Sequence, residues 1–457
     1  MKLYFEAENF LKGSEKGLKS RIFNAKLTNH PKHVYALVIS TLKYKEYILT
    51  IIKKSKLEQD PTIKKLKVKE PVLTLLVHDY LFSSKGRIQS GKHPIKDAFL
   101  ANKTRLHAEL IKFKLKHKVK SVEDLPLKEG VNEDETPVRW FRVNTIKTTP
   151  EALFPTYLFF LSLQPVDSIE EIKSTGVIYK DSYIPNLFGI HPKEKLTSSD
   201  AYKRGEVIIQ DRASCFPAAI LFNDPKDVHS QVIDATAAPG NKTTHLASYL
   251  APISGVVYAF ERDERRMKML KTMCDIATGS KHKNLIHPTH ADFTSISPSD
   301  IPQITGLIVD PSCSGSGIFG RAVEDASTAE QANEEVNTTR LNKLAGFQFK
   351  IVKHALSFPK AHKVVYSTCS IHPHENERVV VDLLRDPLIQ KQGWKLAPRD
   401  IVVPDWPKRA WEQEFSSICD GDLEKCTALA GGCVRFVPKE DGGIGFFAAC
   451  FVRHILA

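Results

Sequence analysis

Hydrophobic side chains recur at helical intervals through residues 1–125 of the chain. The pattern is clear in residues 44–57, in residues 71–82 and in the lysine-rich stretch 100–118, where each helix would have an apolar face. Residues 126–137 are acidic, contain proline and show no apolar period. We therefore predict a basic helical domain over residues 1–125 and a linker over residues 126–137.

The spacing of apolar residues changes after position 137. Residues 138–145, 176–187 and 205–210 are short runs of strand type between turn residues, which predicts a small α+β module over residues 138–211. Beyond this module, β-type runs alternate with segments of helix length. These runs lie at residues 231–233, 256–260, 284–286, 306–309 and 363–366.

Alternation of this kind is typical of a doubly wound, Rossmann-like α/β sheet with parallel strands. Ligands of such sheets bind beyond the carboxyl ends of the strands. We therefore predict an α/β domain over residues 212–457. Within it, the polar insert 321–340 is predicted to be a surface excursion that is followed by a helix to residue 355.

Length and composition favour a globular protein of two or three domains. The 457 residues are 42% hydrophobic and 26% charged, and no stretch approaches the roughly 18–20 apolar residues of a membrane span. The first residues contain neither the basic leader nor the apolar region of a secretory signal. We expect no membrane association, a reducing compartment and a monomer.

The eight cysteines form no CxxC pair, which argues against a zinc ribbon or a thioredoxin-like site. Cys419, Cys426 and Cys433 recur every seven residues. A metal cluster there is one interpretation, but it would need shorter loops and a fourth ligand. We favour buried thiols and predict no metal site.

The positive charge of the chain is concentrated near its beginning. The formal net charge is +12, and residues 1–120 contain 27 Lys+Arg against 10 Asp+Glu, so the remaining residues are slightly acidic. Such asymmetry indicates a polyanionic partner, most commonly nucleic acid. A lysine-rich solvated surface without a partner is the alternative.

Residues 232–244, VIDATAAPGNKTT, predict a buried strand, a turn of small residues and the start of a helix. Small residues let the backbone approach a ligand closely, and a helix N-terminus offers unpaired amides. The phosphate-binding pattern GxxxxGK[ST] is absent. The segment alone indicates a nucleotide-like ligand or a purely structural turn.

Acidic residues follow three successive predicted strands, at Glu261, Asp292 and Asp310. A lone acid at such a position usually caps a helix. Three acids in register at one sheet edge favour a ligand with ribose and adenine moieties.

Three motifs, in this order, resemble those of the Sun-domain RNA cytosine-5 methyltransferases. They are AAPGNKT at 237–243, DPSCSGSG at 310–317 and YSTCSIHPHENE at 366–377. The similarity extends from residue 138 to the C-terminus, and the helical N-terminal part resembles the eukaryotic branch that modifies large-subunit rRNA. The resemblance implies S-adenosylmethionine as cofactor, rRNA or a preribosomal particle as partner, and the nucleolus of the nucleus as location.

The resemblance also implies roles for individual residues. Cofactor contacts are implied for Ala237, Ala238, Pro239, Gly240, Asn241, Lys242, Glu261 (ribose), Arg266, Asp292 (adenine edge) and Asp310 (near the methyl group). The chain departs from the family pattern at Thr236, where cysteine is usual, and at Asn241, where a second glycine is usual. Neither departure removes a charge, so we expect cofactor binding to persist.

Carbon 5 of cytosine is a poor nucleophile until a thiolate adds to carbon 6, so the reaction demands an activated cysteine. Cys313 and Cys369 each follow a predicted strand and have small polar neighbours. The resemblance implies that Cys369 attacks carbon 6, that Cys313 promotes RNA release and that Asp310 meets the cytosine edge. Ser312 replaces the usual proline. Two buried, inert thiols are the structural alternative.

Several functions remain open from the sequence alone. A duplex cannot present carbon 6 to a thiolate, so the cytosine must be unpaired or flipped, and the basic helices and the α+β module would grip the RNA around it. In the module, Trp140, Phe141 and Arg142 are candidate RNA contacts, unless the aromatic residues belong to a core. Alternatives are a DNA cytosine methyltransferase, an enzyme for tRNA or another RNA, and a noncatalytic ribosome assembly factor.

Overall fold

The structure is a computed structural model that describes residues 1–12, 18–122, 124–126, 136–225, 227–318 and 334–453. The chain divides into two compact units. One contains the helices before residue 127 and the other contains both sheets. Most of the linker predicted over residues 126–137 lies outside the described residues, as does the insert up to residue 333.

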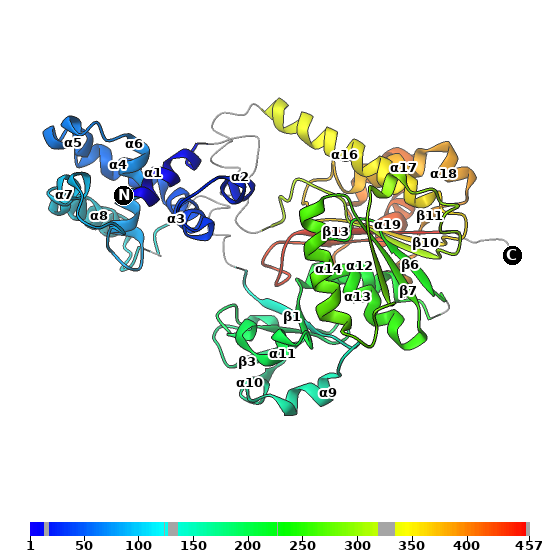
Figure 1. The fold of residues 1–457 in the computed structure, drawn as a ribbon. Helices are drawn as coiled ribbons and strands as arrows, with labels where there is room; N and C mark the ends of the chain where they lie inside the picture. Colours follow the sequence, from blue (N-terminus) through cyan, green and yellow to red (C-terminus); the bar gives the residue numbers. More distant parts are fainter. Residues whose placement is uncertain (13–17, 123, 127–135, 226, 319–333, 454–457) are drawn as a thin grey trace. The chain divides into compact units, whose positions relative to one another are not determined.

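The N-terminal unit is helical and has its own hydrophobic core (Figure 1). Its α-helices are α1 (Lys2–Ala7), α2 (Leu18–Asn24), α3 (Pro31–Lys43), α4 (Lys45–Lys54), α5 (Pro61–Lys65), α6 (Glu70–Val77), α7 (Pro94–Leu100) and α8 (Lys103–His117). The stretch 100–118, which we predicted as one helix, begins only after a break. The amide of Asn102 donates to the carbonyl of Ala98 at 3.0 Å and so satisfies the end of α7.

The predicted α+β module contains a five-stranded sheet of order β2-β3-β4-β1-β5. Its strands are β1 (Arg139–Val143), β2 (Gln164–Val166), β3 (Val177–Lys180), β4 (Leu187–Ile190) and β5 (Val207–Ile209), accompanied by the short helices α9 (Pro150–Leu153), α10 (Leu158–Leu161) and α11 (Asp200–Lys203). The predicted run 176–187 is divided between β3 and β4, because Asn186 has a φ of 59° and turns the chain.

The interpretation of Trp140, Phe141 and Arg142 as RNA contacts is wrong. These β1 residues are only 2%, 0% and 1% exposed. The Trp140 indole donates to the carbonyl of Gly442 at 2.7 Å, and the Phe141 ring packs on Phe188. Trp140 and Arg142 join the module to the rest of this unit, whereas Phe141 belongs to the core of the module itself.

The predicted doubly wound domain is confirmed. Its main sheet has the order β11-β13-β10-β9-β6-β7-β8, and β12 pairs with β13. The strands are β6 (Gln231–Asp234), β7 (Val256–Glu261), β8 (Ile286–His290), β9 (Gly306–Val309), β10 (Lys363–Thr368), β11 (Lys395–Leu396), β12 (Cys433–Phe436) and β13 (Phe446–Val452). The five strands β6 to β10 are parallel, and β13 runs antiparallel beside β10.

Helices cover both faces of this sheet (Figure 1). They are α12 (Arg212–Phe222), α13 (Asn241–Leu250), α14 (Glu264–Thr278), α16 (Glu334–Leu356), α17 (Glu377–Arg385), α18 (Pro387–Lys391) and α19 (Leu423–Gly431). Alternate strand residues supply two cores: Ile308 packs toward α12 to α14, whereas Leu307 and Val309 pack toward α16 and α17. Helix α16 starts at Glu334, so the predicted insert is shorter than 321–340.

Among the described residues, no helix has the length and apolar character needed to cross a bilayer. Cys419, Cys426 and Cys433 are all buried in the core between the sheet and α16 to α19, as the buried-thiol interpretation expects.

Candidate active site

The loop between β6 and α13 is built for close approach to a ligand. Gly240 has a φ of 113°, and a Cβ there would lie 3.0 Å from Cγ of Met273. Both the backbone conformation and the lack of space therefore disfavour a side chain at this position. Beneath the loop, Asp234 accepts hydrogen bonds from Thr243 Oγ1 at 2.7 Å and from the Thr236 N–H at 3.3 Å. Burial raises the pKa of Asp234 to about 6, against the opposing effect of the Thr243 bond.

Charged residues from the next two strands lie beside this loop. Glu261, at the end of β7, is 6% exposed and contacts Arg266 Nη1 at 3.4 Å. Arg266 also donates to the carbonyl of Ala238 in the loop. Asp292, after β8, contacts Arg262 Nη1 at 3.3 Å, and its bonds to Thr294 lower its pKa.

These residues fit S-adenosylmethionine. The Glu261 carboxylate offers the bidentate acceptor that ribose hydroxyls require. Asn241 Oδ1 is buried and has no hydrogen-bond partner in the described part of the chain, so it is an available acceptor for an amino group. Small residues at Ala237 and Ala238, followed by Pro239, leave the backbone open to the ligand.

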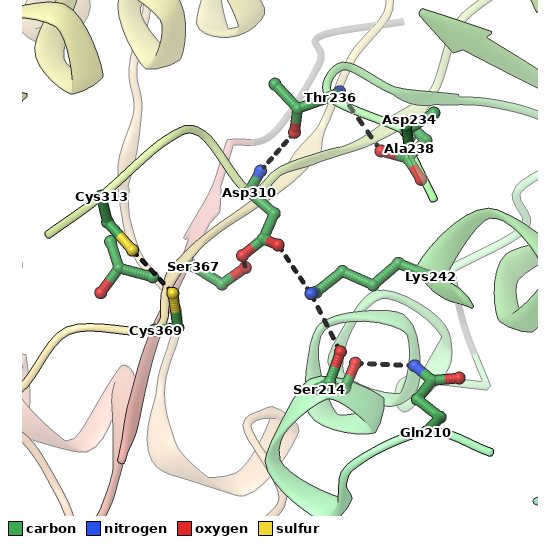
Figure 2. A network of polar contacts seen from close by, with 12 residues as sticks. Gln210, Ser214, Asp234, Thr236, Ala238, Lys242, Asp310, Cys313, Ser367 and Cys369 are labelled. Carbon is green, nitrogen blue, oxygen red and sulfur yellow. Dashed lines mark hydrogen bonds and ion pairs between the residues drawn. The ribbon is translucent and has the colours of Figure 1, made fainter. Parts of the chain in front are cut away.

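Lys242 and Asp310 form an ion pair where β9 ends (Figure 2). Lys242 Nζ lies 2.7 Å from Asp310 Oδ2 and donates to Ser214 Oγ at 3.0 Å. Burial lowers the pKa of Lys242, but Asp310 outweighs it and the net shift is upward. Lys242 therefore remains a charged donor, and its ammonium group is paired with Asp310.

Asp310 is held by two further bonds. Ser367 Oγ on β10 donates to Oδ1 at 2.6 Å, and the Asp310 N–H donates to Thr236 Oγ1 at 3.0 Å. The threonine that replaces the usual cysteine thus has a positioning contact in this chain. Ser367, which reaches Asp310 from β10, was not predicted from the sequence, and Ser214 reaches Lys242 from α12.

The two candidate cysteines meet. Sγ of Cys313 lies 2.8 Å from Sγ of Cys369, and both residues are partly exposed (Figure 2). The bond to Cys369, together with burial, raises the pKa of Cys313 well above its ordinary value. The raised pKa favours the protonated thiol at Cys313, which is able to donate a hydrogen bond to the Cys369 sulfur.

Three serine hydroxyls form hydrogen bonds between the loops that contain the two cysteines. Ser314 Oγ lies 3.1 Å from Ser316 Oγ and 3.2 Å from Ser370 Oγ, and the last two are also 3.2 Å apart. Gly317 donates its N–H to the carbonyl of Cys369 at 3.0 Å. These hydrogen bonds hold the two sulfurs in a fixed relative position.

Two buried side chains support the Cys313 loop from below. Glu375 Oε1 accepts from the Ser314 N–H at 2.8 Å and from Gln348 Nε2 at 3.0 Å. Gln348 also donates to the carbonyl of Ser312 at 3.1 Å. Sequence reasoning assigned neither role: Glu375 lies within the motif at 366–377 without a role of its own, and Gln348 belongs to α16, 36 residues away from Ser312.

Among the described residues, one cluster contains side chains of the kinds that bind metal ions: Asp227, His229 and His362. It lies near the amino ends of the strands, away from the two cysteines. Its imidazole rings are stacked with planes 8° apart, so their lone pairs do not converge on one point. Lys363 Nζ lies 3.0 Å from Asp227 and already neutralises it. The absence of a metal site stays a prediction.

Comparison with known proteins places these features in context. A family model described as 16S rRNA methyltransferase RsmB/F matches residues 220–452. A second model, described as the N-terminal domain of NOL1/NOP2/Sun domain family member 5, matches residues 32–126.

Curated relatives match almost the whole chain. The 25S rRNA (cytosine-C(5))-methyltransferase rcm1 of Schizosaccharomyces pombe is 40% identical over 456 residues, which cover 98% of this chain and 91% of that protein. The 28S rRNA (cytosine-C(5))-methyltransferase of Mus musculus is 32% identical, with 99% and 91% covered. A solved methyltransferase homolog from Pyrococcus horikoshii has a TM-score of 0.52 at 20% identity, with 87% of this chain and 99% of that chain covered, which supports the fold.

Proposed function

The chain belongs to the RsmB/F family of rRNA methyltransferases, and from this membership we propose that it methylates carbon 5 of a cytosine in large-subunit rRNA, with S-adenosylmethionine as methyl donor. The resemblance drawn from the three motifs is thereby confirmed. Both curated relatives are named for this reaction on large-subunit rRNA, and the N-terminal match to a Sun-family member extends the similarity to the basic helices.

The observation that carries this proposal is the pair of sulfurs 2.8 Å apart. Cys313 and Cys369 follow neighbouring parallel strands, so both lie at the carboxyl edge of the sheet beside the Lys242–Asp310 pair. An assembly factor without catalysis has no need of two partly exposed thiols at this edge. A DNA cytosine methyltransferase would place its nucleophile after the fourth strand, where Cys313 stands, and the second thiol, Cys369 after the fifth strand, speaks against that alternative.

In the proposed reaction, Cys369 adds to carbon 6 of the flipped cytosine and makes carbon 5 nucleophilic. Asp310 accepts a hydrogen bond from the exocyclic amino group and holds the ring in place, while Lys242 Nζ donates to the same carboxylate at 2.7 Å. Bound S-adenosylmethionine supplies an electrophilic methyl group on a sulfonium sulfur. Residues 237–242, Glu261, Arg266 and Asp292 would hold it.

Release of the product requires transfer of the carbon 5 proton to solvent, so that its bonding pair restores the 5,6 double bond and the carbon 6–sulfur pair leaves with the Cys369 sulfur as a thiolate. Cys313 is placed to assist, because its sulfur lies 2.8 Å from that sulfur and its raised pKa favours the protonated thiol. A hydrogen bond to the departing thiolate lowers the cost of breaking the carbon–sulfur bond.

Methyl transfer to large-subunit rRNA tests the proposal. Cys369→Ala should abolish transfer from labelled S-adenosylmethionine while leaving cofactor affinity within about twofold, because its sulfur is not among the cofactor contacts. Cys313→Ala should accumulate a protein–RNA adduct that survives denaturant. Cys274→Ala, at a buried cysteine on α14, is the control for loss of a thiol. Full activity of Cys369→Ala would remove the assigned nucleophile.

We further propose that the enzyme acts in the nucleolus and that its basic helices bind the RNA. Mapping of 5-methylcytosine in cells with and without the protein would identify the target. Methylation confined to tRNA or another RNA would overturn the rRNA assignment. Absence of any saturable S-adenosylmethionine binding would instead favour the assembly factor.

A further inference from the structure

We propose that Trp411 is a stacking platform for an unpaired RNA base next to the target cytosine, with Arg378 and His374 beside it for the adjoining phosphate. The inference rests on the proposed function, since it assigns part of the RNA site of that reaction. A flipped cytosine leaves its neighbours unstacked, and such bases commonly stack on aromatic side chains.

Trp411 differs from the other three tryptophans in its exposure. It is 41% exposed, whereas Trp140, Trp394 and Trp406 are 2%, 4% and 2% exposed. Those three also donate their indole N–H groups to main-chain carbonyls. Core packing accounts for them and leaves the exposed ring of Trp411 unexplained.

The indole ring of Trp411 is held firmly. The guanidinium carbon of Arg435 lies 3.8 Å from its ring centre. Arg435 is fixed in turn by Nε and Nη2, which donate to the buried carboxylate of Glu377 at 2.6 and 2.7 Å. The Trp411 main-chain N–H donates to the same carboxylate at 3.1 Å. A ring fixed in this way loses little conformational freedom when a base binds.

Arg435 also connects Trp411 to the catalytic loop. Its Nη1 donates to the carbonyl of Ile371 at 3.2 Å, and Ile371 stands two residues after Cys369. Trp411 is therefore separated from the loop of the nucleophile by the width of one side chain. A nucleotide adjoining the cytosine at Cys369 lies within reach of the ring.

Basic side chains continue the surface beyond Trp411. Arg378, in the first turn of α17, donates to Glu414 Oε2 at 3.0 Å and shares a hydrogen bond with His374 Nε2 at 2.9 Å. Glu414 lies in the 3-10 helix Glu412–Ile418 that directly follows Trp411. These contacts place Arg378 between the tryptophan and the groove that separates α16 from α17.

This groove has a volume of about 620 Å³. Its charged lining residues are Lys350, Arg378, Arg385, Asp382 and Asp386, with His374 at one position. Arg378 is paired with Glu414 at 3.0 Å and Asp386 with Lys353 Nζ at 2.5 Å, so the remaining charges are Lys350 and Arg385 against Asp382. The balance favours a phosphodiester backbone as occupant. The groove, with Trp411 at its border, combines charge and stacking, as sites for single-stranded RNA do.

Steady-state kinetics of the full chain on a large-subunit rRNA transcript test the platform. Trp411→Ala should raise the KM for RNA about tenfold, with kcat and the KM for S-adenosylmethionine changed less than about twofold. Trp411→Phe should restore most of the loss, because a phenyl ring also stacks. Leu388→Ala, at another exposed apolar side chain, is the matched control. An unchanged KM for RNA in Trp411→Ala overturns the proposal.

Tryptophan fluorescence tests the platform independently of the proposed function, because the fluorescence measurement requires neither methyl transfer nor cofactor. Bound transcript should protect wild-type protein from acrylamide quenching, and Trp411→Phe should lack the quenchable component. Equal quenching with and without bound RNA would refute the platform even in an active enzyme, and would point to a protein partner on this surface. Protection without any methylation would refute the proposed function and leave the platform standing. This measurement also decides the matter if Trp411→Ala fails to fold.

Discussion

At the scale of single residues, Asp234 illustrates how the cofactor loop depends on a buried charge. The residue is 1% exposed at the end of β6, and its carboxylate anchors the loop through Thr236 and Thr243. Burial raises its pKa from 3.8 to about 6. The folded protein therefore holds a proton on Asp234 over a range of pH in which the unfolded chain has released it.

The sign of the resulting pH dependence follows from proton binding. Between about pH 4 and pH 6 the folded state binds more protons at Asp234, so the contribution to stability is present below pH 4 and is lost as the pH rises through 6. In Asp234→Asn this loss is absent. The free energy of unfolding of the variant, relative to wild type, should grow by about 2 kcal/mol between roughly pH 4.5 and 7.5.

Urea unfolding of both proteins at the two pH values measures this difference. Asp382→Asn, at an exposed aspartate on α17, is the control and should show no such growth. A constant difference between Asp234→Asn and wild type would mean that Asp234 is already ionised at low pH in the folded protein.

The sequence could predict site residues where a reaction needs a particular group at a strand end. Cys313, Cys369 and Asp310 were named in this way, and the structure brings them to one edge of the sheet. It could not predict Gln348 as a support of the Cys313 loop, since a buried amide on a distant helix leaves no pattern in the sequence, and the motif that contains Glu375 did not reveal which loop its carboxylate contacts.

At the scale of elements, buried parallel strands were predictable and the edges of the sheet were not. The run predicted at 284–286 is displaced, because β8 is an edge strand whose residues after Ile286 are mostly exposed. Apolar residues therefore mark only its beginning. Strand β13 was not predicted, since its uninterrupted apolar run does not reveal that it pairs antiparallel with β10, β11 and β12.

Arg142 connects strand β1 to helix α13, and its removal should affect both the fold and the cofactor loop. From β1 its guanidinium donates to Gln210 Oε1 at 2.8 Å, to Thr244 Oγ1 at 2.5 Å and to the carbonyl of Asn241 at 3.3 Å. Arg142→Met keeps most of the volume but leaves buried acceptors unpaired. We expect a loss of about 3 kcal/mol in the free energy of unfolding and weaker binding of S-adenosylmethionine, because Asn241 begins the helix of the cofactor loop.

Chemical denaturation and calorimetric titration with S-adenosylmethionine measure the two effects. Arg139→Met is the matched control on the same strand, where a partly exposed arginine donates to the carbonyl of Glu194. If Arg142→Met loses stability but binds the cofactor as wild type does, the module supports the fold and has no influence on the loop.

At the scale of the whole molecule, charge and chemistry are divided between the two units. The sulfurs, the Lys242–Asp310 pair and the cofactor loop all belong to the second unit, whereas residues 1–120 hold the entire positive excess of the chain. The boundaries of the predicted domains at 125, 137 and 211 stay proposals. The module and the α/β domain share buried contacts such as Trp140 with Gly442, and a composition change alone does not reveal such contacts.

Removal of residues 1–126 therefore separates RNA affinity from methyl transfer. A protein that neutralises phosphates releases counterions, so the logarithm of its affinity falls linearly with the logarithm of salt concentration, with a slope set by the number of phosphates contacted. The truncated chain should bind a large-subunit rRNA transcript at least about tenfold more weakly near 0.1 M salt, with a shallower slope. Its affinity for S-adenosylmethionine should be unchanged, because every cofactor residue lies after position 236.

Filter binding across a salt series measures the slope, and isothermal titration with the cofactor is the control for correct folding of the second unit. An RNA affinity and slope equal to those of the full chain would show that the lysine-rich helices serve another partner and that the second unit alone provides the RNA contacts.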